Sequence, residues 1–407
     1  MVGGDPAHAG VAEGPPAPYR QVWSTKIGER GPVAGPVVLG DVVVVVAQRG
    51  VVALSAATGD VRRELRRVPG PTGPAAVDGE LLIYGEGSGR DAYLRASPED
   101  GQGGWRYETK SPVVGGVTVD EGRAYVGGRD GNVHAIDLET GEEIWTFAAP
   151  GRVETPPAVA EDLVVFVAEG FKTGRAAAYA LDAQTGKEEW SLSPEGVAFG
   201  ASAVAVGDEL AVFGLGDLEV HALELETGRE RWSARSRAPF SARLVPAFGE
   251  DVLIGDRLGH LARLDATSGQ ERWVFRVPGN FLTGSPIIVG QTVIVGDTSG
   301  QVSAIDVTSG HLVWKEQLGG AIGGVAAANG RIFLSSADGS VVALEHDPGG
   351  VLLDEASPTT LFVGRAVLNF ALAFAPLVVV LVTLFRWVGR RRGMQLPEGA
   401  TTTEGDG

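Results

Sequence analysis

The chain has 407 residues, of which 44% are hydrophobic and 21% charged, a composition typical of folded rather than disordered proteins. It contains 60 glycines and 23 prolines but no cysteine, so turns are frequent, while disulfides, cysteine nucleophiles and thiolate metal sites are excluded. The formal net charge of −17 opposes contact with a phosphate backbone, and no nucleic-acid partner is expected.

The first 18 residues are rich in glycine, proline and alanine. They lack the basic start and the apolar stretch of a signal peptide, and they predict a flexible leader over residues 1–18. The segment that follows contains Trp23 and has no complete repeat before it.

An internal repeat organises residues 19–349. In five copies an acidic anchor precedes a glycine by four residues and a tryptophan by eight; these anchors are Asp137, Asp182, Glu224, Asp265 and Asp306. Three degenerate copies have Ser55, Ser97 and Glu345 as anchors, so the eight anchors lie 39 to 45 residues apart. Each period contains four short apolar segments separated by turns, which predicts an all-β, eight-bladed propeller of four-stranded antiparallel blades.

The repeated tryptophans and glycines have mechanical roles in this interpretation. We expect the indole rings to pack each outer strand against the next blade, and the glycines to supply the positive φ of a tight turn. The tryptophans are Trp23, Trp105, Trp145, Trp190, Trp232, Trp273 and Trp314, and the glycines are Gly59, Gly141, Gly186, Gly228, Gly269 and Gly310. The eighth copy has Leu353 in the tryptophan position, so Trp23 is expected to supply the outermost strand of the last blade and close the ring.

The phrase Ala-[Ile/Leu]-Asp-x-x-Thr-Gly-x-x-x-Trp, as in residues 135–145, resembles the repeat of pyrroloquinoline-quinone-like (PQQ-like) eight-bladed propellers. That family contains quinoprotein dehydrogenases and non-enzymatic relatives such as the propeller lipoprotein of the outer-membrane β-barrel assembly machinery. The resemblance covers about four fifths of the chain and concerns structural residues, so it implies the fold more strongly than a function.

In the dehydrogenase branch the resemblance implies a quinone, a calcium site, a general-base aspartate and a ring of adjacent cysteines. This sequence has no cysteine, no room for long insertions between blades, and no calcium-ligand run around Asn132 or Asn280. We therefore predict no catalytic residue, no quinone and no calcium or other metal, as in the non-enzymatic branch. His134 and His221 occupy equivalent positions in blades three and five, and packed strand histidines are the favoured interpretation.

The segments that enter the first strand of each blade are mostly small and apolar. The exceptions are candidates for binding a small polar ligand at one mouth of the central channel, with close blade packing as the alternative; they are Arg152, Glu154, Ser241, Arg243 and Thr283.

The end of the chain predicts a membrane anchor. After a linker over residues 350–365, residues 366–385 carry no charge, and 20 residues of helix cover roughly 30 Å of hydrocarbon, which predicts a transmembrane helix over residues 366–388. Arg386 and residues 390–392 follow the span, whereas Arg365 alone stands close before it. The positive-inside rule then makes the tail, residues 389–407, cytoplasmic and the propeller extracytoplasmic.

Export of a propeller that precedes its only span requires a signal, and none is visible in residues 1–18. Either a start upstream of Met1 supplies it, or the chain is tail-anchored with a cytoplasmic propeller. The leading hypothesis is a membrane-anchored, extracytoplasmic, non-catalytic scaffold that binds other envelope proteins. The alternatives are a small-molecule-binding sensory or quinoprotein-like domain that signals through the helix, and a cytoplasmic tail-anchored scaffold.

Overall fold

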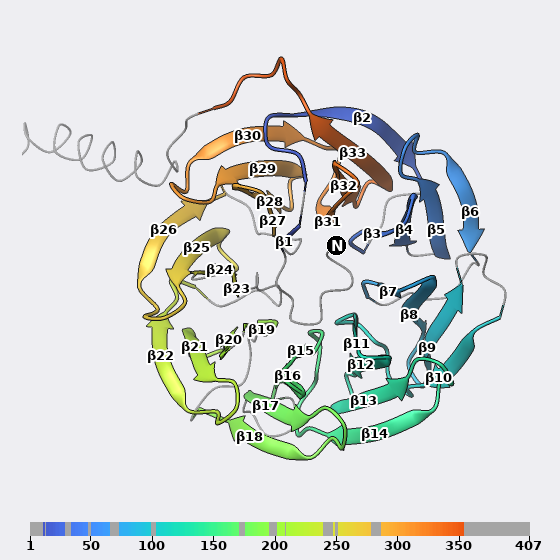
Figure 1. The fold of residues 1–407 in the computed structure, drawn as a ribbon, viewed down its shortest axis with the longest axis vertical. Helices are drawn as coiled ribbons and strands as arrows, with labels where there is room; N and C mark the ends of the chain where they lie inside the picture. Colours follow the sequence, from blue (N-terminus) through green and yellow to red (C-terminus); the bar gives the residue numbers. More distant parts are fainter. Residues whose placement is uncertain are drawn as a thin grey trace, which may run out of the picture. The chain divides into compact units, whose positions relative to one another are not determined.

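The structure is a computed structural model, and it describes residues 11–12, 14–28, 34–47, 50–65, 73–98, 103–170, 176–194, 202–207, 209–238, 247–248, 251–277 and 286–353. Within these ranges the regular secondary structure is β-strand, arranged in eight sheets. Figure 1 shows the sheets placed radially around one axis. The predicted all-β, eight-bladed propeller is therefore confirmed.

Each sheet forms one blade, and its strands run in order from the axis to the rim. The first four blades are blade 1 with β3 (Val37–Leu39), β4 (Val42–Ala47), β5 (Gly50–Ser55) and β6 (Val61–Leu65); blade 2 with β7 (Ala76–Asp78), β8 (Leu81–Ser88), β9 (Asp91–Pro98) and β10 (Trp105–Glu108); blade 3 with β11 (Val117–Asp120), β12 (Arg123–Gly127), β13 (Asn132–Asp137) and β14 (Glu143–Ala148); and blade 4 with β15 (Ala158–Ala160), β16 (Leu163–Ala168), β17 (Ala177–Asp182) and β18 (Glu188–Leu192).

The other four are blade 5 with β19 (Ala205–Val206), β20 (Leu210–Gly214), β21 (Glu219–Glu224) and β22 (Glu230–Arg235); blade 6 with β23 (Ala247–Phe248), β24 (Asp251–Gly255), β25 (His260–Asp265) and β26 (Glu271–Arg276); blade 7 with β27 (Ile287–Val289), β28 (Thr292–Gly296), β29 (Gln301–Asp306) and β30 (Leu312–Gln317); and blade 8 with β31 (Ile322–Ala328), β32 (Arg331–Ser336), β33 (Ser340–His346) and β2 (Tyr19–Lys26). Neighbouring strands within every blade are antiparallel, as four-stranded propeller blades require.

The ring closes through the beginning of the chain. Strand β2 pairs antiparallel with β33, and Trp23 lies opposite Ala343, so the expected closing strand is confirmed. A further short strand, β1 (Val11–Ala12), pairs parallel with β27, the innermost strand of blade 7, on the side of the axis (Figure 1). This strand lies within the segment predicted as a flexible leader, so part of that leader is folded.

The apolar core is divided into eight clusters. Each cluster fills the interface between two consecutive blades, here called a seam, and one of the eight joins blade 8 to blade 1. Residues 42–46 in β4, for example, are all valine and all buried, because both faces of this strand are covered by neighbouring blades. Continuous apolar strands of this kind are therefore explained by burial on two sides.

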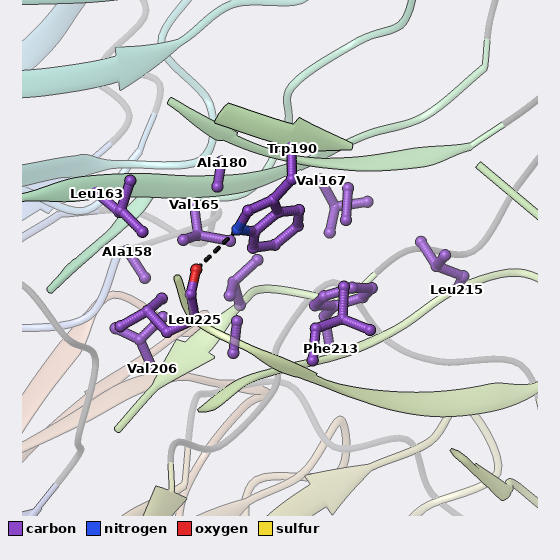
Figure 2. Packing of buried hydrophobic residues seen from close by; sticks show 14 of the residues in the cluster. Ala158, Leu163, Val165, Val167, Ala180, Trp190, Val206, Phe213, Leu215 and Leu225 are labelled. Atoms are coloured by element: carbon purple, nitrogen blue, oxygen red, sulfur yellow. Dashed lines mark hydrogen bonds between the residues drawn. The ribbon is translucent and has the colours of Figure 1, made fainter. Parts of the chain in front are cut away.

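The repeated tryptophan fastens one blade to the next (Figure 2). In seam 4–5 the Trp190 Nε1 donates a hydrogen bond to the Leu225 carbonyl oxygen at 2.7 Å. The ring covers Gly228, whose φ is +67° and where an added Cβ would lie 2.6 Å from Trp190 Cγ. Glycine is therefore required here both by its backbone conformation and by the close approach of the indole.

The same arrangement recurs around the ring. The indole hydrogen bonds join Trp23 to Ala56, Trp105 to Leu138, Trp145 to Ala183, Trp232 to Ala266 and Trp273 to Val307, and the corresponding glycines under the rings are Gly59, Gly141, Gly186, Gly269 and Gly310. Trp314 differs, because its Nε1 donates to the Tyr19 carbonyl oxygen in β2, the strand that comes from the beginning of the chain.

The second copy of the repeat differs from its expected alignment. In the other blades with a complete repeat the tryptophan lies opposite the residue two before the anchor, as Trp145 lies opposite Ala135. Trp105 lies opposite Ala96, so Pro98 and not Ser97 occupies the anchor position. The physical reason is that β9 and β10 pair without the register shift found in the outer strand pair of the other blades, so this copy is one residue shorter.

The predicted transmembrane helix over residues 366–388 and the tail over residues 389–407 lie outside the described residues, as does most of the linker. Within the described ranges, no helix has the length and apolar character needed to cross a membrane. The last described segment ends at Leu353, whose backbone N–H donates to the Val313 carbonyl oxygen in β30 at 2.8 Å.

Candidate functional site

Of the predicted channel-mouth residues, the structure describes Arg152 and Glu154, and both lie in the loop between β14 and β15, the first strand of blade 4. The Arg152 backbone pairs with that of Glu169, the residue just after β16, through two N–H to carbonyl hydrogen bonds of 2.8 and 2.7 Å. Two of the five candidates are therefore held in one loop, while the other three, Ser241, Arg243 and Thr283, lie outside the described residues.

The Glu154 carboxylate forms an ion pair with Arg129. Its Oε1 lies 2.8 Å from Nε of Arg129, a residue in the turn between β12 and β13. The Arg129 side chain is about half exposed, whereas the Oε1 atom of Glu154 is shielded from solvent, so the pair lies at the boundary between the loop and solvent. A ligand that approached this loop would meet a paired carboxylate. Sequence reasoning missed Arg129, because a turn residue shows no sign of which neighbouring loop it faces.

His134 in blade 3 packs in seam 2–3. Its Nδ1 lies 2.9 Å from the Thr146 hydroxyl and 3.2 Å from the Tyr107 hydroxyl, and its ring is 6% exposed. Burial lowers the pKa of His134 below its ordinary value, although Asp130 and Glu143 act in the opposite direction. This histidine is therefore predominantly neutral at pH 7.

His221 in blade 5 has the opposite electrostatic setting. Its Nδ1 lies 2.7 Å from Glu230 and its Nε2 lies 3.0 Å from Asp217. Burial alone would lower the pKa of His221, but the hydrogen bonds to Asp217 and Glu230 outweigh it and raise the pKa above its ordinary value. Both ring nitrogens of His221 face carboxylates, so the arrangement is an ion-pair network and not an incomplete metal site.

Sequence reasoning singled out the two histidines but not their acidic neighbours. A signal was present, because an aspartate four residues before and a glutamate nine residues after the histidine occur in both blades: Asp130 and Glu143 around His134, and Asp217 and Glu230 around His221. The same spacing yields opposite pKa shifts because burial dominates at His134, whereas the hydrogen bonds to two carboxylates outweigh burial at His221. In blade 3 the Asp130 carboxylate instead accepts from Asn132, and Nε2 of His134 has no hydrogen-bond partner among the described residues.

The described residues can be compared with the calcium site of the dehydrogenase branch. Within them, no three histidine, aspartate or glutamate side chains are grouped so that they could hold a metal ion. The chain has no cysteine for a ring of adjacent cysteines, and β1 lies on the axial edge of blade 7 (Figure 1). No chemical step is derived through these groups.

The radial blades, the tryptophan seams and the repeat define the class of protein as a PQQ-like repeat propeller. The family model described as "Outer membrane protein assembly factor BamB" matches residues 90–256 and 257–352, and the chain belongs to this family.

Relatives from both branches are similar to the chain. It is 35% identical over 118 residues to the outer membrane protein assembly factor BamB of Nitrosomonas eutropha, which covers 29% of this chain and 27% of the relative. It is 33% identical over 150 residues to the quinohemoprotein alcohol dehydrogenase ADH-IIG of Pseudomonas putida, which covers 30% and 20% respectively. The chain thus aligns with only about a quarter of the length of these relatives.

Solved structures show the same fold. BamB from Moraxella catarrhalis superposes with a TM-score of 0.66 at 18% identity, covering 81% of this chain and all of that one. The quinohemoprotein alcohol dehydrogenase ADHIIG of Pseudomonas putida HK5 superposes with a TM-score of 0.69 at 13% identity, covering 86% and 80%. The fold therefore occurs both in BamB and in an alcohol dehydrogenase, so the fold by itself does not assign a function.

Proposed function

We propose that the chain is a non-catalytic, protein-binding scaffold of the cell envelope. The supporting observation is how the characteristic residues are used. The repeated tryptophans and glycines pack the seams, and the described loop that contains Arg152 and Glu154 holds the Arg129–Glu154 ion pair. Membership of a family described as an outer membrane protein assembly factor agrees with protein partners. In this proposal the chain needs neither quinone nor calcium.

The proposal includes the anchor deduced from the sequence. Residues 366–388 span the membrane once, the tail over residues 389–407 is cytoplasmic, and the propeller faces other envelope proteins outside the cytoplasm. A propeller tethered in this way stays close to membrane-bound partners, which raises the effective concentration of each for the other.

The test is an attempt to reconstitute dehydrogenase activity. The full-length protein is incubated with pyrroloquinoline quinone and calcium, then assayed for reduction of an electron-accepting dye with primary alcohols and with sugars. We expect no rate above that of a sample without protein, with a quinoprotein dehydrogenase reconstituted in parallel as the positive control. Saturable turnover by this chain would overturn the non-catalytic assignment.

A further inference from the structure

Blade 7 has a fifth strand at its axial edge (Figure 1). Its sheet has the strand order β1, β27, β28, β29, β30, whereas the other seven sheets contain four strands each within the described ranges. Strand β1 pairs parallel with β27, with Val11 opposite Ile288 and Ala12 opposite Val289. A segment from the beginning of the chain therefore covers the edge of a blade from near its end.

The edge that β1 covers is a backbone edge. The side chains of β27 belong to the core, because Ile287 and Val289 pack in seam 7–8 and Ile288 packs in seam 6–7. An edge strand still presents a row of backbone N–H and C=O groups, which can pair with any other extended segment. Addition of a strand to such an edge is one of the recurring ways in which proteins bind peptides. The site that β27 offers is therefore made of backbone groups.

The segment that follows β1 is held without it. Tyr19 is 4% exposed, and its hydroxyl lies 3.1 Å from Oγ1 of Thr292 and donates to the Pro15 carbonyl oxygen at 3.2 Å. The Pro18 carbonyl oxygen accepts a hydrogen bond of 2.8 Å from the backbone N–H of Asp347. These contacts fasten the beginning of β2, so β1 can leave the edge of blade 7 while the ring stays closed.

Gly14 brings the chain to this edge. It lies between blades 7 and 8, where an added Cβ would be 2.5 Å from Cγ1 of Val289 and 3.6 Å from Cβ of Ala327. Val289 is completely buried, so it has little freedom to move away from a larger residue. Glycine at position 14 therefore allows the close approach of the backbone that places residues 11–12 beside β27.

The pairing of β1 is weak enough to be reversible. Two residue pairs supply few backbone hydrogen bonds, and the net gain from each is similar in size to the entropy lost when one residue is fixed. The attachment to Gly14 compensates, because a short tether gives the segment an effective concentration in the millimolar range at the edge. A longer segment of another protein, which forms more backbone hydrogen bonds, can therefore compete with β1.

We propose that the axial edge of blade 7 is a binding site for an extended segment of a partner protein, and that residues 11–12 are an internal ligand that occupies this site until the partner displaces them. The partner segment adds to β27 as a parallel strand through its backbone, in the way that the chain's own segment does. This inference rests on the proposed scaffold function, for which it gives the chemistry of the partner segment and a means of regulation.

The experiment follows the isoleucine methyl signals of the full-length protein by NMR. Val11→Pro combined with Ala12→Pro removes both backbone N–H groups of β1 and should release it. The Ile288 signal should then move away from its wild-type position, whereas the signal of Ile136, in seam 2–3, should not.

A peptide with the sequence of the internal ligand then tests the edge. Blocked Ala-Gly-Val-Ala-Glu, the sequence of residues 9–13, should return the Ile288 signal of the proline variant to its wild-type position, with saturation in the millimolar range. Blocked Ala-Gly-Pro-Pro-Glu should have no effect. If β1 occupies the edge for nine tenths of the time, the wild-type protein should need about 10-fold more of the first peptide.

A second releasing variant has a matched control. Gly14→Val adds a side chain that overlaps Val289, so it should release β1 from its other end, and it replaces the proline variant if that variant does not fold. Gly28→Val should leave the Ile288 signal in place, because nothing lies within 4 Å of an added Cβ at Gly28.

The inference is overturned if the Ile288 signal stays in place in the releasing variants, if the first peptide does not restore it, or if the signal of Ile136 moves with it. Equal restoration by the proline peptide would also overturn it, because the peptide would then not bind through backbone pairing. None of these outcomes bears on the dye-reduction assay, so the scaffold proposal fails or survives separately.

Discussion

The contact between Trp190 and Gly228 leads to a quantitative prediction. Alanine at position 228 keeps the positive φ of +67°, which costs an L-residue about 1–2 kcal/mol, and its Cβ meets the indole at 2.6 Å. Relief of that overlap in a packed seam adds about 1–3 kcal/mol. Trp190→Ala removes a buried ring and its hydrogen bond to Leu225, at a cost of about 3–5 kcal/mol.

The two costs should not add. Once the ring is gone, Gly228→Ala retains only the backbone strain, so the double variant should be more stable than the sum of the single variants by about 1–3 kcal/mol. Unfolding in urea, followed by circular dichroism so that loss of a tryptophan does not alter the signal, measures each free energy of unfolding.

Gly122→Ala is the matched control. Gly122 has a similar φ of +72°, but no atom lies within 4 Å of an added Cβ. Gly122→Ala should lower the free energy of unfolding only by the backbone strain, and by the same amount whether or not Trp190 is present. Additivity of Trp190→Ala and Gly228→Ala to within about 0.5 kcal/mol would refute the role assigned to this contact.

Four further predictions concern closure of the ring, the protonation of two histidines, and the blade that has Arg63 in the tryptophan position. Deletion of residues 1–27 removes β1 and β2 and should lower the melting temperature sharply; an unchanged melting temperature would contradict closure through Trp23. The pKa of His221 is higher in the folded protein than in the unfolded chain, so protonation of His221 stabilises the fold. This contribution to the free energy of unfolding is complete below pH 6.5 and is lost as the pH rises through the folded-state pKa. His221→Gln should abolish this loss of stability at high pH, as measured by unfolding in urea. The pKa of His134 is lower in the folded protein, so the free energy of unfolding should fall as the pH drops below 6.5, and His134→Gln should remove this decrease. A pH profile of stability that neither histidine substitution alters would refute the two pKa shifts. Arg63 lies opposite Ala53 in the position that tryptophan holds in other blades, so Arg63→Trp should raise the melting temperature, and a decrease would argue against the equivalence of the seams.

The repeat made the propeller predictable from the sequence. Five complete copies carry the anchor, the glycine and the tryptophan at constant spacing, and each of these residues has a local role in a turn or a seam. The spare Trp23 made the closing strand predictable as well, because a blade without its own tryptophan needs one from elsewhere.

Other features depend on contacts between distant segments. Strand β1 is two residues long and pairs with β27, which is more than 270 residues away in the sequence. No local sequence pattern predicts such a strand. The sequence analysis placed the second anchor at Ser97 instead of Pro98 for a similar reason. The pairing of β10 with β9 lacks the register shift of the other blades, and this can be recognised only in the structure.

Of the channel-mouth candidates, Arg152 and Glu154 could be assigned to one loop, whereas the partner of Glu154 could be recognised only in three dimensions.

The central claim is that the propeller works as a scaffold on the outer side of a membrane, and the absence of cysteine makes it directly measurable. Single cysteines are introduced at Ala148, which is exposed on β14, and at Thr402 in the tail, and intact cells are treated with a membrane-impermeant maleimide. The account predicts labelling at position 148 and none at position 402 until the cells are opened. Labelling at 402 alone would contradict it and place the propeller in the cytoplasm.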